Sequence, residues 1–178
     1  MSTADDEGEW ILDETKNAVD WYCYAAETGD DSIAKFMMYW IAFNWLYSKE
    51  NVRGDRLKIR QYCSDNYRIL NRYKPWRDSP EAFKVFDDGP VLNLSGDQTH
   101  PTPEQLYESV HTRYGKIKVT SLLTTIYQVR CNLFHGSKQP RDTRDRELIK
   151  SSAVIMERYL WEVLADSNRH FVEMFPLP

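Results

Sequence analysis

Apolar residues recur at helical spacing along most of the chain, and this pattern predicts the elements in order. The first helix is expected from Trp10 to the stop at Thr28-Gly29. Asp30 to Ser32 form the N-cap region of a second helix, which runs to about Ser48. The second helix is apolar nearly all the way round, which is typical of a central helix. Residues 1–9 are mostly polar and acidic, and we expect them to form a disordered tail.

In the middle of the chain, the helical pattern gives way to a stretch that is rich in proline. A third helix is predicted from Arg53 to Asn71, and it is rich in Arg and Tyr. Five of the eight prolines then fall within about thirty residues, so residues 74–103 are expected to be irregular, with a short helix at Pro80–Asp87. We call residues 74–103 the proline-rich segment. Pro103 opens a further helix to about Tyr114, which Gly115 ends.

The helix predicted from Lys118 to His135 has the clearest core-facing stripe, formed by Leu122, Ile126, Val129 and Leu133. A last helix is predicted from Thr143 to Ala165. The short polar connection between them predicts that the two helices pack antiparallel. Since no stretch alternates with period two, the fold class is all-α: a single helical bundle over residues 10–178 with an irregular proline-rich insertion.

Charge and cysteine content narrow the class of protein. The 178 residues carry 23 basic and 27 acidic side chains, so any contact with nucleic acid must be local. Three cysteines that lie far apart, with no CxxC pair, fit a reducing cytoplasm. The acidic start does not resemble a signal peptide. The longest apolar run, Phe36 to Tyr47, is shorter than the roughly twenty residues that a bilayer requires, so no membrane span is expected.

Several common sites are missing from the sequence. No glycine-rich phosphate loop is present, and the four histidines form neither HExxH nor a compact cluster with carboxylates. We therefore expect no cofactor and no metal.

One group of polar residues gathers at the end of the Lys118–His135 helix. At 100° per residue, His135 falls on the side away from the core stripe, Asn132 lies within about 60° of it, and Arg130 lies on the flank. These three residues are thus expected to face away from the core. A surface histidine that is stabilised only by the negative end of the helix dipole is the alternative interpretation.

This group suits phosphate chemistry. A histidine beside the carbonyl oxygens of a helix end has its cationic form favoured, which suits a general acid or base. An adjacent arginine can bind a phosphate and stabilise the charge of its transition state. Lys138 could contact a phosphate as well, although a solvated loop lysine is the simpler interpretation.

The segment from Ile126 to Lys138, followed by Asp142, Arg144 and a last apolar helix, resembles the C-terminal half of HEPN domains, and the helix from Phe36 to Tyr47 is similar to an early helix of that family. The resemblance implies a helical bundle, commonly a homodimer, in which many members are metal-independent endoribonucleases that act through an Arg-x4–6-His motif.

Arg130 and His135 match that motif, whereas Cys131 follows the arginine where catalytic members often carry Asn, Asp or His. The resemblance implies an RNA substrate, a toxin, defence or stress role, and a possible antitoxin or regulatory protein partner. The alternatives are a non-catalytic HEPN module that binds a nucleotide or a protein, and a helical scaffold with an aromatic binding surface.

Overall fold

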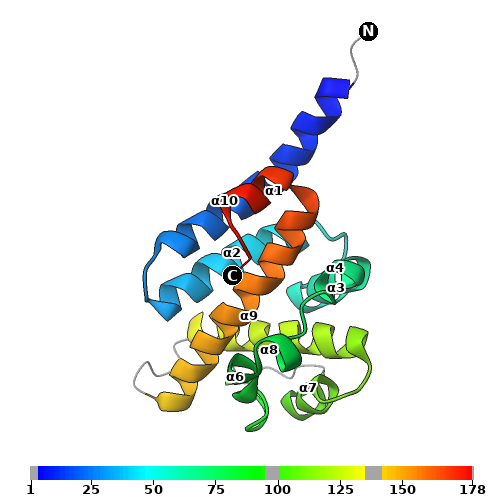
Figure 1. The fold of residues 1–178 in the computed structure, drawn as a ribbon. Helices are drawn as coiled ribbons and strands as arrows, with labels where there is room; N and C mark the ends of the chain where they lie inside the picture. Colours follow the sequence, from blue (N-terminus) through cyan, green and yellow to red (C-terminus); the bar gives the residue numbers. More distant parts are fainter. Residues whose placement is uncertain (1–3, 95–100, 135–141, 178) are drawn as a thin grey trace.

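The computed structural model describes residues 4–94, 101–134 and 142–177, and every regular element in these ranges is an α-helix (Figure 1). The all-α fold class is thereby confirmed. The buried side chains form one apolar cluster that extends from Ala18 to Phe171. In the described ranges, no helix combines the length and the apolar character that crossing a bilayer requires.

Helices α1 (Ala4–Glu27) and α2 (Ser32–Ser48) form a hairpin. Gly29 allows the sharp turn because its φ is +65°, and the Asp31 carboxylate caps α2 by accepting from the backbone N–H groups of residues 33 and 34. Helix α1 includes residues 4–9, which the sequence analysis assigns to a disordered tail. The first turns of α1 extend beyond the bundle (Figure 1).

Helix α2 packs along α9 (Thr143–Ser167), and this is the longest contact between the two halves of the chain. Its inner face buries large aromatic side chains, namely Phe36, Tyr39, Trp40, Phe43 and Tyr47. Asn44 and Trp45 remain exposed on the outer face. The helix is therefore less enclosed than its nearly continuous apolar composition predicts.

The helix predicted from Arg53 to Asn71 is interrupted. The structure has α3 (Asp55–Asp65) and α4 (Tyr67–Leu70), separated at Asn66, whose backbone leaves helical geometry at φ −99° and ψ 13°. Helix α3 packs on α8, whereas α4 packs mainly on α9. Because of this break, the two parts of the predicted helix pack on two different helices.

The proline-rich segment contains α5 (Pro75–Asp78) and α6 (Pro80–Lys84), followed by turns and irregular chain to residue 94. A proline begins each of these helices, and the N–H that proline lacks would not form a hydrogen bond within the helix at this position. Buried apolar side chains, among them Phe83, Val85, Phe86 and Val91, hold the segment on the bundle. Leu92 is 54% exposed, and its carbonyl oxygen accepts a hydrogen bond from Asn132 on α8.

Helix α7 (Pro103–Val110) begins with a capping box between Thr102 and Gln105. Gly115 was expected to end the preceding helix, but α7 ends at Val110 and Gly115 is the first residue of α8 (Gly115–Phe134). A side chain at Gly115 would lie only 2.7 Å from the Tyr67 hydroxyl oxygen. A larger residue at position 115 would therefore force the end of the Tyr67 side chain to move.

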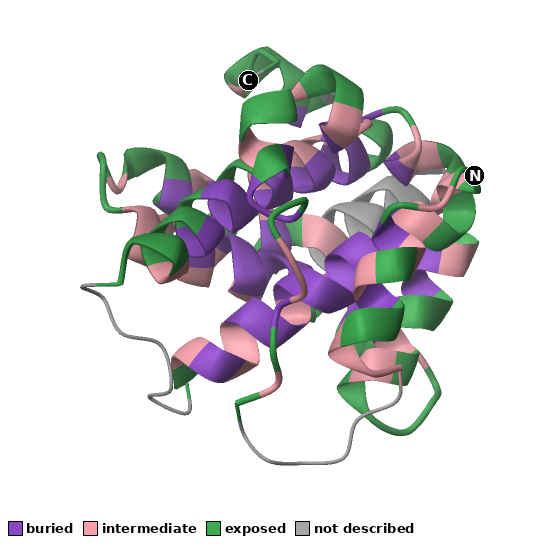
Figure 2. Ribbon diagram, turned by 90° about the horizontal axis from the view of Figure 1, so that it is seen from below, coloured by how far each residue is buried: buried purple, intermediate pink, exposed green. Residues whose placement is uncertain are grey.

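The antiparallel pairing predicted for α8 and α9 is wrong. Helix α8 crosses the lower part of the molecule, and α9 runs across it towards α1 and α2 (Figure 1). Helix α9 packs more extensively on the apolar face of α2 than on α8. The direction of α9 therefore follows from this packing and not from the short connection between α8 and α9. Buried residues concentrate along the middle of α8 (Figure 2), and α10 (Arg169–Met174) closes the chain against α9.

Candidate functional site

Arg130 lies near the C-terminal end of α8, just before its last turn. Its guanidinium carbon is 4.2 Å from the centroid of the Phe134 ring, which is 55% exposed. The Nε atom is buried without a hydrogen-bond partner, and within the described ranges Arg130 forms no ion pair. The aromatic ring therefore positions a guanidinium whose charge no described carboxylate neutralises.

Two tyrosines near Arg130, Tyr47 and Tyr127, keep their protons at physiological pH. Burial raises the pKa of Tyr47, and the positive charge of Arg130 acts in the opposite direction without reversing it. Burial also raises the pKa of Tyr127, and its hydrogen bond with Cys131 raises that pKa further. These phenols cannot serve as bases near neutrality, so proton transfer at this place needs another group.

A second arginine, Arg56, which no motif in the sequence indicated, lies close to the same end of α8. Its guanidinium carbon is 5.4 Å from the centroid of the Tyr127 ring, and Nη2 donates to Oε1 of Gln128. The other terminal nitrogen, Nη1, is buried without a hydrogen-bond partner. No spacing in the sequence links Arg56 to Arg130, because only the packing of α3 on α8 brings it there.

Asn132 was expected to face away from the core, and this prediction is wrong. The side chain is 1% exposed, and its Nδ2 donates to the carbonyl oxygen of Leu92 at 2.7 Å. Its Oδ1 accepts from the backbone N–H of Leu94 at 3.2 Å and from Nε2 of Gln128 at 2.9 Å. The proline-rich segment covers the face of α8 opposite the core stripe, which a helical projection of α8 alone cannot show.

His135 and Lys138, the other two predicted site residues, lie outside the described residues. The described part of α8 ends at Phe134, immediately before His135. The structure thus places Arg130 beside Phe134 and at the end of α8 that Arg56 also approaches. Asn132 is buried and does not belong to this group.

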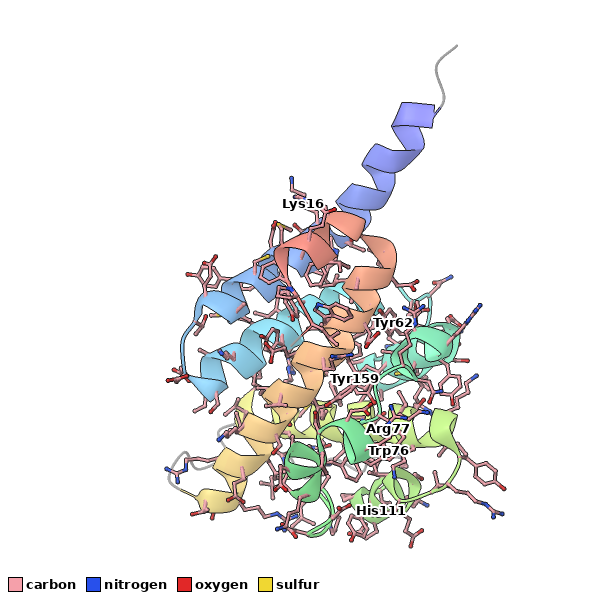
Figure 3. The ribbon with its side chains drawn as sticks, viewed as in Figure 1. Lys16, Tyr62, Trp76, Arg77, His111 and Tyr159 are labelled. Carbon is pink, nitrogen blue, oxygen red and sulfur yellow. The ribbon has the colours of Figure 1, made fainter. Side chains whose placement is uncertain are left out.

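A histidine–carboxylate pair occurs elsewhere, between α7 and the proline-rich segment. Nε2 of His111 is 2.7 Å from Oδ1 of Asp87, and Nδ1 is 2.6 Å from the carbonyl oxygen of Tyr107. Figure 3 shows His111 low in the molecule, on the same side as Trp76. Both ring nitrogens face protein acceptors, so the pair joins two segments and leaves no nitrogen for a substrate.

No three His, Cys, Asp or Glu side chains lie close enough to hold a metal ion within residues 4–94, 101–134 and 142–177. The three cysteines are free thiols, and Cys63 is buried. Among the described residues, the groups available for chemistry near Arg130 are consequently guanidinium, phenol, thiol and amide.

Comparisons of the chain with protein-family models, with curated proteins and with solved structures found no match.

Proposed function

We propose that this protein is a metal-independent endoribonuclease of the HEPN type, acting in the cytoplasm in a toxin, defence or stress system. Arg130 stabilises the phosphate and His135 is the general acid or base. The observation that carries the proposal is the guanidinium of Arg130, held over an exposed Phe134 ring and free of any described ion-pair partner. It stands five residues before His135, the spacing of the HEPN motif.

The chemistry requires only these groups. The ribose 2′-oxygen attacks phosphorus and loses its proton to a histidine, while the bond from phosphorus to the 5′-oxygen breaks and that oxygen takes up a proton. The products are a 2′,3′-cyclic phosphate and a free 5′-hydroxyl. Arg130 stabilises the doubly negative transition state through two parallel N–H donors, as guanidinium groups do with phosphate.

Asn132 has no part in this proposal, because the backbone of the proline-rich segment and Gln128 already occupy its amide. Lys138 remains a predicted phosphate contact. We further propose that the active form is a homodimer, since attack on phosphorus and protonation of the leaving oxygen call for groups on opposite sides of the phosphate, and a two-fold axis can supply them from two chains.

The test is incubation with end-labelled single-stranded RNA in the presence of EDTA. Wild-type protein should cleave and leave cyclic phosphate ends, and His135→Ala and Arg130→Ala should each lose at least about a hundredfold in rate. His170→Ala is the matched control, because that histidine is exposed on α10. Full activity of His135→Ala, or an absolute requirement for Mg²⁺, would contradict the proposal.

The second candidate is a non-catalytic HEPN module that binds a nucleotide or a protein partner such as an antitoxin. It is favoured by Cys131, which stands where catalytic members often carry a polar residue and whose hydrogen bond goes to Tyr127. Such a module would bind a mononucleotide in an Arg130-dependent way, and it would leave RNA intact under every metal condition.

A further inference from the structure

Helices α3 and α8 pack antiparallel, and polar contacts mark both ends of their contact. Near the start of α3, Nη2 of Arg56 donates to Oε1 of Gln128. Near its end, Nζ of Lys116 donates to Oγ of Ser64 at 2.9 Å. We call the surface between these contacts the α3/α8 seam.

Four cations follow this seam: Arg56 and Arg60 on α3, and Lys116 and Arg130 on α8. The two arginines of α3 are one helical turn apart and therefore share a face. None of the four forms an ion pair with the described residues. Elsewhere in the molecule, arginines do pair with carboxylates, as in Arg72 with Asp166 at 2.5 Å and Arg158 with Glu162 at 2.7 Å.

A groove of about 500 Å³ lies at the Lys116 end of the seam. Arg60 and Lys116 line it together with hydroxyl-bearing residues such as Ser109, Thr120 and Ser121, and among the described residues no carboxylate lines it. Two cations and several hydroxyl groups without an acidic side chain are the donors that phosphate oxygens and ribose hydroxyls accept from.

We propose that single-stranded RNA follows the α3/α8 seam away from Arg130, with its phosphates on Arg60 and Lys116, so that the groove is a backbone-binding subsite. This proposal deepens the proposed function and rests on it. Arg130 and Lys116 are fourteen positions apart in α8, which corresponds to about 21 Å at 1.5 Å per residue. That length accommodates several nucleotides.

The geometry favours a single strand over a duplex. The cations form one row, and the net charge of −4 provides no broad basic face of the kind that a duplex contacts. Exposed apolar side chains flank the row at both ends: Phe134 beside Arg130, and Ile117, which is 49% exposed, in the groove. Unpaired bases can pack on such side chains, whereas the bases of a duplex are already stacked.

The experiment measures binding separately from cleavage, by fluorescence anisotropy of a labelled 2′-O-methyl RNA oligonucleotide that has no 2′-hydroxyl to attack phosphorus. The test variants of the full chain are Arg60→Gln, Lys116→Gln and their combination. The matched control is Lys84→Gln with Lys150→Gln, two exposed lysines that line another groove, between α6 and α9, together with Glu81 and Glu147. Thermal unfolding checks that each variant is folded.

We expect the double seam variant to weaken binding on the order of tenfold and to lower the slope of log K against log salt by about 1.4, which is 0.7 for each lost phosphate contact. The control pair should change neither quantity.

Unchanged affinity and slope in the folded double seam variant would overturn the seam proposal, whatever the cleavage assay shows. Preference for a poly-aspartate peptide over RNA would overturn it too. Seam-dependent RNA binding without cleavage of ordinary RNA would instead refute the ribonuclease assignment and leave the seam as an RNA-binding surface.

Discussion

Asn132 donates from Nδ2 to the carbonyl oxygen of Leu92 over 2.7 Å, which joins the last turn of α8 to an irregular part of the proline-rich segment. The same side chain accepts from the backbone N–H of Leu94 and from Gln128, whose Nε2 also donates to Oδ1 of Asn93. The backbone of an irregular segment carries polar groups that need partners when they are buried. Asn132 and Gln128 supply these partners from α8.

Asn132→Ala should therefore lower the free energy of unfolding by about 2–4 kcal/mol, because it removes three hydrogen bonds and leaves buried groups without partners. Urea unfolding followed by circular dichroism measures the change. Asn44→Ala on the exposed face of α2 is the control and should stay within about 0.5 kcal/mol of wild type. If Asn132→Ala keeps wild-type stability, the amide does not hold the segment.

Helix content and most helix ends follow from local rules, which the sequence displays directly. Asp31 caps α2 as the Asp30–Ser32 cluster predicts, and the predicted starts at Pro103 and Thr143 agree with α7 and α9. Capping and apolar periodicity involve residues within a few positions of one another, so these features need no knowledge of distant contacts.

The relations between distant segments were not predictable in the same way. Asn132 is buried, contrary to the prediction, because residues 91–94 cover α8. The spacing of apolar residues within α8 cannot indicate that another segment covers it. Arg56 enters the neighbourhood of Tyr127 only through the packing of α3 on α8. The direction of α9 likewise depends on how much apolar surface α2 offers, which is a comparison between whole helices.

Two tyrosines provide a matched pair for a hydrogen-bond prediction. The Tyr39 hydroxyl donates to Oε1 of Glu157 at 2.7 Å, whereas the hydroxyl of Tyr159, inside the bundle on α9 (Figure 3), is buried without a hydrogen-bond partner. Tyr39→Phe should cost about 1.5–3 kcal/mol, the usual value for a hydrogen bond to a charged group. Tyr159→Phe should be neutral or slightly stabilising. Chemical denaturation of both variants tests the contrast, and equal losses would contradict it.

Alkaline pH should destabilise the protein partly through Cys63. Burial raises the pKa of this thiol from 9.0 to about 12, against a smaller lowering by a hydrogen bond with Thr120. The folded state therefore keeps the proton that the unfolded chain releases above pH 9. This contribution to stability is complete below pH 9 and is lost as the pH rises towards 12.

The measurement is the free energy of unfolding between pH 8 and pH 11 for wild type and Cys63→Ala. Buried tyrosines such as Tyr62, whose pKa burial also raises, act in the same direction in both proteins. The difference between the two pH profiles thus isolates the thiol, and the variant should lose less stability than wild type above pH 9. Parallel profiles would show that the Cys63 thiol ionises alike in both states.

A two-fold homodimer should share its catalytic groups between chains. Each chain offers one Arg130 and one His135, while attack by the 2′-oxygen and protonation of the 5′-oxygen occur on opposite sides of phosphorus. A two-fold axis places identical surfaces face to face, so it doubles the set without further residues. The exposed Phe134 and the guanidinium above it lie at the end of α8, where a second chain can approach.

Mixing inactive Arg130→Ala and inactive His135→Ala proteins distinguishes a shared site from two separate ones. A mixed dimer keeps one arginine and one histidine on different chains, and random exchange makes about half of all dimers mixed. Partial recovery of RNA cleavage, after light scattering has established the dimer mass and differently tagged chains have established exchange, is the expected result. Recovery must come from the mixed dimers, because each parent dimer lacks one of the two groups entirely. A strictly monomeric and fully active enzyme, or exchange without any recovery, would show that Arg130 and His135 act within one chain.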